Sequence, residues 1–532
     1  MLFLQAVVLG TIVVSGYGSD RRFPSGFKFG SASSAYQVEG GWNASDKGES
    51  VWDRYAHDHP DIVVNGNGDV ACDSYHLWKE DIRIAHELGL HFYRFSISWT
   101  RIMPTGFPTA ISETGKQYYS NLIDGLLEKG IEPVVTLYHW DLPQKLQDLG
   151  GWTNPLITDW FSDYARIIFS FYADRVKTWI TINEPILICD GAYNMEFTAP
   201  RIKEMEMAPF LCNKHTLIAH AKAWRIYDTE YRHKYHGKVS LTNNLVWMEP
   251  FTPEYEDLAE LALQHCAGRY AHPIFSKEGG WPPLLEKVIA EYSRKQGHVR
   301  SRLPPFTKAE KELIRGTYDF FAMNMYTSRL VRPSEPGDGP RIWFVTGSPE
   351  LNITLVADPR WKVGAVSIMP AYPVGMRRQI AWLRREYGQH LPILITETGY
   401  GSLDRNLDDE ERIDFISDHL EQILLSIKED GANIIGFSVW TLMDNFEWMD
   451  GYRSRFGLYD VDFKDPMRKR TPRASAHFYS HLIKTQILHK TRVRSHRHED
   501  VRMSKRSSNS SSNFTGLMLL LYTIFLQLFI LL

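Results

Sequence analysis

One structural unit recurs along the chain: an amphipathic helix, a glycine, and then a short apolar strand. In the first clear copy, apolar residues at helical spacing between Leu77 and Leu88 are followed by Gly89 and by the strand-like segment 91–99. The unit returns in the segments 122–138, 167–181, 376–396 and 413–440. Because strands that alternate with helices pair in parallel, this pattern predicts an α/β protein with a parallel sheet.

Three further segments, 27–30, 239–242 and 319–324, are typical of strands and bring the expected number to eight. Eight such strands favour a single (β/α)8 TIM barrel with long βα loops over an open sheet. A minimal barrel takes about 250 residues, whereas this chain has 532. We therefore predict one barrel domain over residues 19–490, with its longest loops around 190–215 and 330–370.

Both ends of the chain carry apolar runs that are typical of targeting segments. The run 2–14, followed by small residues, predicts a signal peptide over residues 1–18; because no Lys or Arg precedes it, a buried N-terminal strand is the alternative. Residues 491–514 are basic and then Ser/Asn-rich, as in a stalk, and residues 515–532 match a GPI-anchor signal. A retained membrane tail is the alternative for this last segment, although its roughly 16 apolar residues are fewer than the 20 or so that span a bilayer.

These end segments predict that the barrel domain lies in the secretory pathway, tethered on the extracellular face of the plasma membrane or in a lumen. Sequons at Asn43 and Asn352 fit that compartment. A net charge of −3 provides no basic surface for nucleic acid. In an oxidising lumen four cysteines could form two bridges, and the sequence does not choose among three connectivities: Cys72, Cys189, Cys212 and Cys266. The oligomeric state is not indicated.

Polar and aromatic side chains follow seven of the eight predicted strands. They are Gln37, Glu39, Arg94, Trp99, His139, Trp140, Asn183, Glu184, Asn324, Tyr326, Glu397, Trp440, Glu447 and Trp448. In a (β/α)8 barrel the carboxyl ends of the strands converge on one face, so these side chains would form one site. Glu184 and Glu397 end the fourth and seventh predicted strands, on opposite sides of the barrel mouth.

Two carboxylates that face each other across a pocket are the machinery of glycoside hydrolysis. A metal site is the rival interpretation of Glu184 and Glu397. No histidine stands near either residue at the spacing of metal ligands, so we expect no metal.

These segments resemble glycoside hydrolase family 1, the β-glucosidase, lactase-phlorizin hydrolase and Klotho group. The likeness covers nearly all of residues 23–485, and the motifs that carry it are 27–40, 93–99, 138–143, 181–185 and 440–448. The resemblance implies a retaining β-glycosidase that hydrolyses β-glucosides or β-galactosides through a glycosyl-enzyme intermediate, without a cofactor.

The resemblance also implies a role for each site residue. Glu184 would be the acid/base and Glu397 the nucleophile, and the charge of Glu397 would raise the pKa of Glu184. Arg94 and Asn324 would support this pair, and Tyr326 would hold Glu397 while also facing the substrate. The sugar itself would be held by hydroxyl-binding residues and an apolar wall: Gln37, His139, Asn183, Glu447, Trp440 and Trp448.

The chain departs from the family pattern in three places. Thr398 stands where the family usually has Asn, and the entrance segments 195–210 and 360–373 are atypical, so the aglycone cannot be inferred. A Klotho-like tethered binding protein, catalytically weak or inactive, is an alternative, but both carboxylates remain here. A thioglucosidase is a weaker alternative, because plant myrosinases replace the acid/base with Gln whereas this chain keeps Glu184.

Overall fold

The computed structural model describes residues 21–489, except 65, 195–197, 205 and 340–341. The described residues fall within one compact unit. The predicted signal peptide (1–18), stalk (491–514) and apolar tail (515–532) lie outside the described residues, so they stay predictions. Among the helices of the described part, none combines the length and the apolar character that crossing a bilayer requires.

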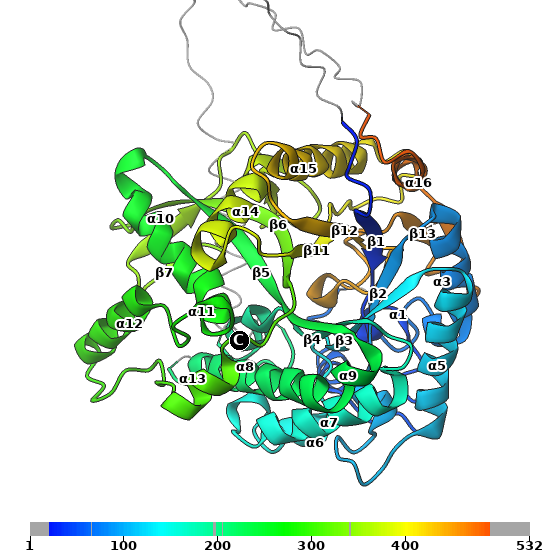
Figure 1. The fold of residues 1–532 in the computed structure, drawn as a ribbon, viewed down its shortest axis with the longest axis horizontal. Helices are drawn as coiled ribbons and strands as arrows, with labels where there is room; N and C mark the ends of the chain where they lie inside the picture. The colour runs from blue at the N-terminus through cyan, green and yellow to red at the C-terminus, as the bar shows by residue number, and fades with distance from the viewer. Residues whose placement is uncertain (1–20, 65, 195–197, 205, 340–341, 490–532) are drawn as a thin grey trace, which may run out of the picture. The chain divides into compact units, whose positions relative to one another are not determined.

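Eight parallel strands form the centre of the fold (Figure 1): β1 (Lys28–Ala32), β2 (Phe92–Ser96), β3 (Glu132–Tyr138), β4 (Thr178–Asn183), β5 (Lys238–Pro250), β6 (Phe321–Pro333), β11 (Ile393–Thr398) and β12 (Ile434–Trp440). Each strand pairs in parallel with the next one in this series, and β12 pairs in parallel with β1, so the ring of pairings closes. The predicted α/β class with a parallel sheet is confirmed, and each of the eight predicted strands is present.

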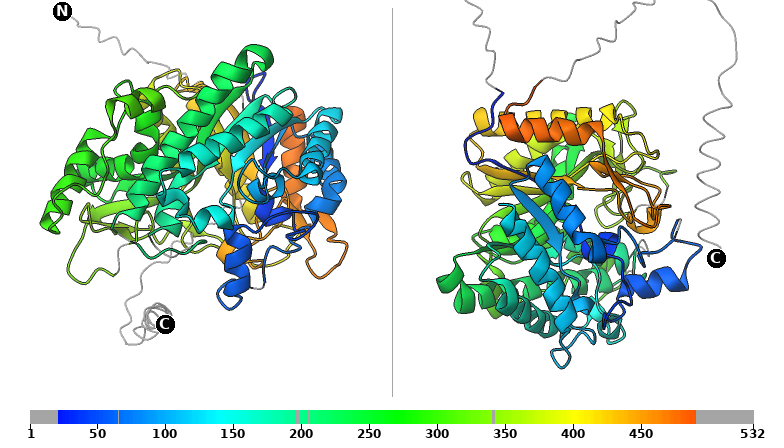
Figure 2. Two further views of the ribbon diagram at one scale, coloured as in Figure 1. Left: turned by 90° about the horizontal axis from the view of Figure 1, so that it is seen from below. Right: turned by 90° about the vertical axis from the view of Figure 1, so that its right-hand side faces the viewer.

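Helices surround these strands, as Figures 1 and 2 show from three directions. The longer ones are α3 (Ser74–Leu88), α5 (Glu113–Glu128), α7 (Ile157–Tyr172), α8 (Ala208–Ile226), α12 (Pro283–Lys295), α14 (Pro373–Tyr387), α15 (Glu410–Lys428) and α16 (Ala474–Thr485). The shorter ones are α1 (Ala35–Val38), α2 (Val51–Asp58), α4 (Trp99–Ile102), α6 (Gln144–Gln147), α9 (Arg232–Tyr235), α10 (Glu256–Leu263), α11 (Arg269–Phe275) and α13 (Lys308–Ile314).

The recurring glycine has a definite structural task. Gly89 ends α3 in the left-handed region, with φ of 78°, and its N–H donates to the carbonyl of Ala85. Only glycine takes this conformation without strain, so it turns the chain from helix into strand. The strands it leads to are buried along their whole length, as in β2 and β11, because helices cover the outside and side chains fill the inside.

The segment 330–370, expected as a long loop, is partly extended. β8 (Ile353–Val356) pairs antiparallel with the outer end of β6, β7 (Gly347–Ser348) pairs with β8, and β9 (Lys362–Val363) forms a hairpin with β10 (Pro370–Ala371). A last small sheet joins β13 (Tyr459–Val461) and β14 (Arg470–Pro472). β8 and β7 join the central sheet because β6 runs beyond the ring and offers a free edge, whereas β9–β10 and β13–β14 are separate two-stranded sheets.

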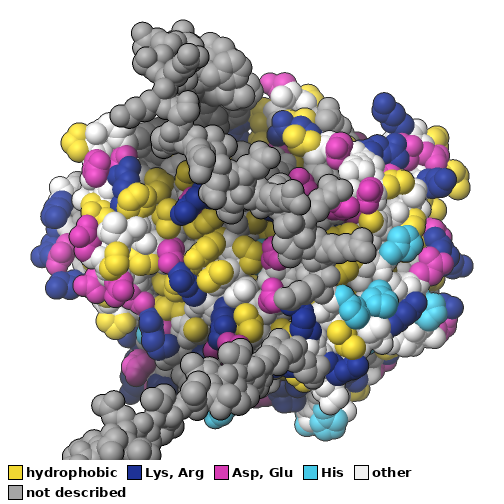
Figure 3. All heavy atoms as spheres, turned by 90° about the horizontal axis from the view of Figure 1, so that it is seen from above, with side chains coloured by type: hydrophobic (Ala, Val, Ile, Leu, Met, Phe, Trp, Pro, Cys, Tyr) yellow, Lys and Arg dark blue, Asp and Glu magenta, His cyan; other side chains and the backbone are white. Residues whose placement is uncertain are grey.

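The four cysteines do not form two bridges, which corrects the sequence-based expectation. Cys189 and Cys212 are joined, whereas Cys72 and Cys266 are buried free thiols. The bridge ties the π-helical turn after β4 (Leu187–Ala192) to α8. On the face seen in Figure 3, acidic and basic side chains are interspersed.

Candidate active site

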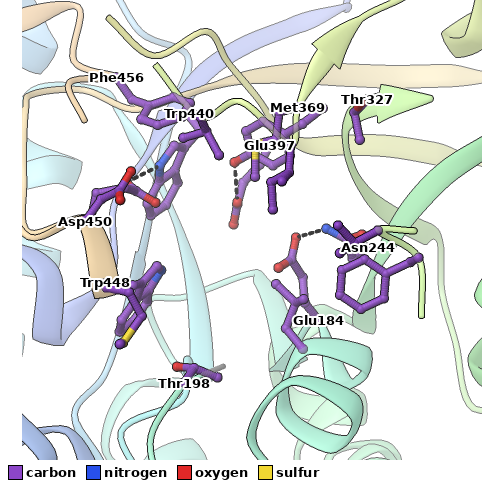
Figure 4. Close-up of a pocket in the computed structure, with 18 of the residues that line it drawn as sticks. Glu184, Thr198, Asn244, Thr327, Met369, Glu397, Trp440, Trp448, Asp450 and Phe456 are labelled. Carbon is purple, nitrogen blue, oxygen red and sulfur yellow. Dashed lines mark hydrogen bonds between the residues drawn. The ribbon is translucent and has the colours of Figure 1, made fainter. Parts of the chain in front are cut away.

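A cavity of about 310 Å³ opens among the carboxyl ends of the parallel strands (Figure 4). Trp140, one of the predicted strand-end residues, lines it, and so do seven of the eleven residues to which the resemblance gives a role: His139, Glu184, Tyr326, Glu397, Trp440, Glu447 and Trp448. The other four lie behind the wall, and each is hydrogen-bonded to a residue that lines it: Gln37, Arg94, Asn183 and Asn324. The structure therefore brings all eleven together, although they come from segments that span most of the chain.

Glu397 ends β11, and both of its carboxyl oxygens accept hydrogen bonds. Oε1 accepts one from Arg94 on β2, and Oε2 accepts one from the Tyr326 hydroxyl on β6 at 2.7 Å. Burial raises the pKa of Glu397, while the charge of Arg94 and the bonds from Arg94 and Tyr326 act to lower it. These two donors favour the carboxylate form, which is the form that a nucleophile needs.

Glu184 follows β4 directly, and its backbone has a positive φ of 47°. Its Oε1 accepts hydrogen bonds from the side-chain amides of Asn324, at 2.7 Å, and Asn244, at 2.9 Å. Burial, and then the charge of Glu397, raises the pKa of Glu184 to about 8. The sequence-based expectation named only the charge of Glu397 as the cause, whereas burial is the larger one.

Figure 4 shows the carboxyl groups of Glu184 and Glu397 pointing into the same cavity. Glu397 accepts hydrogen bonds from a guanidinium and a phenol, whereas the partners of Glu184 among the described residues are two neutral amides. Because their surroundings differ, Glu397 is suited to act as a nucleophile and Glu184 as a proton donor. Unlike environments give two chemically identical groups different roles in one site.

The rest of the wall that would face the sugar consists of aromatic rings and one further carboxyl group, that of Glu447. The His139 ring lies 5.8 Å from the Trp440 ring and 6.0 Å from the Trp448 ring, each close to parallel. Burial holds the pKa of His139 well below its usual range, so its imidazole is neutral. Burial also raises the pKa of Glu447 to about 8, and its Oε2 accepts from Trp440 Nε1 at 3.5 Å. Flat apolar faces beside hydrogen-bonding groups suit a sugar ring.

Sequence reasoning missed Asn244, which donates to Glu184 from β5. The signal was present, because Asn243 and Asn244 directly follow the predicted strand 239–242, as polar residues follow the other strands. It also missed the outer wall of the cavity, which is largely apolar and includes Leu187, Val246, Phe344, Val345, Val366, Ile368, Met369 and Phe456.

Two further expectations concern Thr398 and metal ions. Thr398 is buried, and its hydroxyl has no hydrogen-bond partner among the described residues. In the same part of the chain, no group of three His, Cys, Asp or Glu side chains is placed to hold a metal ion.

A parallel α/β fold whose strand ends carry two buried carboxyl groups in one cavity is the arrangement that glycoside hydrolases use. The model of glycosyl hydrolase family 1 matches residues 19–487, and the chain belongs to this family. It is thus a retaining, β-glucosidase-like glycosidase.

Two of the similar curated proteins match along almost their whole length. The chain is 43% identical to Myrosinase 1 of Brevicoryne brassicae, over 88% of this chain and 99% of the relative. It is 40% identical to the cytosolic beta-glucosidase of Homo sapiens, again over 88% and 99%. Among solved structures, an aphid myrosinase superimposes with a TM-score of 0.82 at 42% identity, covering 87% of this chain and 99% of that one.

Proposed function

We propose that the protein hydrolyses β-glucosides or β-galactosides by double displacement, with Glu397 as nucleophile and Glu184 as acid/base. The observation that supports this assignment is the pair of unlike environments within one cavity. Arg94 and Tyr326 favour a charged Glu397, whereas burial, and then the charge of Glu397, raises the pKa of Glu184 to about 8. These environments favour one negative charge, on Glu397, and one proton, on Glu184, as the first step requires.

In the first step the Glu397 carboxylate attacks the anomeric carbon while Glu184 gives its proton to the departing glycosidic oxygen. The products are the free aglycone alcohol and a glycosyl ester on Glu397. In the second step the Glu184 carboxylate takes a proton from water, whose oxygen attacks the same carbon and displaces Glu397. Two inversions leave the β configuration of the sugar unchanged.

The closed ring of eight parallel strands supports a (β/α)8 TIM barrel, whose active site lies where the strands end. Asn183 and Gln37 do not line the cavity, so they would affect sugar binding through the residues that do. Asn183 contacts Arg94 and His139, and Gln37 contacts Glu447, so each orients groups that face the substrate.

The experiment that tests this function is trapping with a 2-deoxy-2-fluoro β-glucoside that carries a good leaving group. Mass analysis should find a covalent sugar on Glu397, and Glu184→Gln and Glu397→Gln should each abolish turnover of a simple β-glucoside while the protein stays folded. Full activity in either variant would refute the assignment. No adduct and no turnover, repeated with galactosides and thioglucosides, would instead favour the binding-protein alternative.

We also propose that the protein resides in the secretory pathway and is tethered through its C-terminal segment, by a GPI anchor or a membrane tail. The bridge between Cys189 and Cys212 supports an oxidising compartment. The sequon residues Asn43 and Asn352 are exposed, so both are accessible to glycosylation. Deleting the last 18 residues should release active protein into the medium; a truncated form that stays on membranes would contradict the tether.

A further inference from the structure

Arg329 is a buried cation in the wall of the active-site cavity. It lies on β6, three residues beyond Tyr326 in the direction in which that strand leaves the ring, and only 4% of its surface is exposed. Because Tyr326 holds Glu397, Arg329 lies outward of the reacting groups, on the side where an aglycone would sit. None of the roles proposed so far uses it.

The charge of Arg329 has no counter-charge in the described part of the chain. The other buried arginines there each form a salt bridge with a carboxylate: Arg94, Arg101, Arg269, Arg302, Arg412, Arg470 and Arg473. Arg329 forms none, and burial alone lowers its pKa to about 10. An unpaired buried charge costs several kcal/mol of folding free energy, so its retention calls for a reason.

The neutral partners of Arg329 leave one donor unused. Nε donates to the Val345 carbonyl at 3.1 Å, and Nη1 donates to the Ser328 carbonyl at 2.8 Å and the Thr327 hydroxyl at 2.9 Å. Nη2 donates to the Ile368 carbonyl. A guanidinium has five N–H groups, so one on Nη2 has no acceptor among the residues that the structure describes.

The same four bonds place the guanidinium between two segments that line the cavity. Val345 lies in the segment after β6, and Ile368 lies in the hairpin loop between β9 and β10. The surrounding wall is apolar, which strengthens any charge-assisted bond formed there. Asp450, an acidic residue of the same cavity, forms a salt bridge with Arg453, and Figure 4 shows it on the opposite side of the cavity from Thr327.

We propose that Arg329 binds an oxyanion carried by the aglycone of the substrate: a carboxylate, sulfate or phosphate on an otherwise apolar group. This inference rests on the proposed glycosidase function and names the substrate class of the same site. The anion would supply the missing counter-charge and accept from the free Nη2–H, while the apolar wall would hold the rest of the aglycone.

The test compares two glucosides that differ only in charge. One carries a para-(carboxymethyl)phenyl aglycone and the other the neutral primary amide of the same shape; analogues with a sulfate or phosphate in the same place distinguish the three oxyanions. For the preferred anion, wild-type kcat/KM should exceed that of the amide by about tenfold or more, as expected for a hydrogen bond to a charged group. In Arg329→Met this ratio should fall to about one, and Arg329→Lys should keep part of it.

Arg453→Met is the matched control. Arg453 lines the same cavity, but it is half-exposed and already paired with Asp450 at 2.8 Å. Its substitution should leave the ratio between charged and neutral substrates near the wild-type value. A ratio near one for all three anions in the wild type, or an unchanged ratio in Arg329→Met, would overturn the proposal.

Arg329→Met could fail to fold, because Arg329 also holds Val345 and Ile368 in place. The wild-type ratio still decides the question in that case, since it needs no variant. If no glucoside is cleaved, the proposed function fails independently of this inference. Calorimetry with para-hydroxyphenylacetate and its amide then tests Arg329 alone, and equal affinities would overturn its role.

Discussion

The pKa of Glu184 should fall by about two units when Glu397 becomes glycosylated. In the free protein, burial and then the charge of Glu397 raise the pKa of Glu184 to about 8. The carboxyls of a retaining pair lie about 5–5.5 Å apart, where a unit charge at an effective dielectric constant of about 20 contributes about 3 kcal/mol, or about 2 pKa units. Forming the ester removes that charge, so Glu184 should titrate near pH 6 or so in the intermediate. Burial remains, which keeps this pKa above the ordinary value of 4.5.

Two pH profiles measure the pKa of Glu184, one in the free protein and one in the glycosyl intermediate. The free protein needs protonated Glu184, so the alkaline limb of kcat/KM should fall as pH rises through about 8, while ionisation of Glu397 sets the acid limb. The intermediate needs deprotonated Glu184, so reactivation of the 2-fluoroglucosyl protein should rise with pH through a midpoint about two units lower and then level off. The return of activity after removal of excess inhibitor gives this second rate.

Glu184→Gln provides the control for these profiles. Its reactivation by water should be slow and independent of pH, and azide should restore it, because azide attacks without a general base. Equal midpoints in the two wild-type profiles would refute the reasoning, since they would mean that burial alone sets the pKa of Glu184. A midpoint that falls to the ordinary value of 4.5 would refute the role given to burial.

Three further substitutions test other contacts of the site. Arg94→Met leaves the nucleophile carboxyl buried without its cation, so kcat/KM should fall about 100-fold or more and the acid limb of its pH profile should move to higher pH. Asn244→Leu removes a hydrogen bond that lowers the pKa of Glu184, so the alkaline limb should move up by about one unit or less. Cys189→Ser opens the 23-residue bridge to Cys212, and denaturant unfolding should show a loss of about 3 kcal/mol with an unchanged fold.

The strands inside the ring were predictable from the sequence, whereas their extensions were not. The last predicted strand, 434–440, matches β12 residue for residue. The predicted segments 239–242 and 319–324 are only the inner parts of β5 (Lys238–Pro250) and β6 (Phe321–Pro333). Their outer halves are stabilised by pairing with each other, and β6 also by β8. The pairing of β5 with β6 joins segments about 80 residues apart, and a local hydrophobic pattern does not show it.

The inner part of the site was predictable for a related reason. Residues at the ends of parallel strands must converge when the sheet closes, so the placement of Glu184 and Glu397 follows from their positions in the strand series. The outer wall comes from segments 344–345 and 365–369, which have no periodic pattern and depend on the extension of β6. The residues on the aglycone side of the cavity could therefore not be predicted from the sequence.

Charge compensation is the property that sequence reasoning could not supply, and it distinguishes the two ends of the cavity. At the sugar end Arg94 is matched by Glu397, which fixes one carboxylate and leaves Glu184 to hold a proton. At the outer end Arg329 is matched by nothing in the described residues. Both uncompensated groups, a buried carboxyl and a buried guanidinium, oppose folding when charged. The buried carboxyl of Glu184 is explained by catalysis, which needs its proton. The buried guanidinium of Arg329 is likewise explained by function if the substrate brings the missing negative charge.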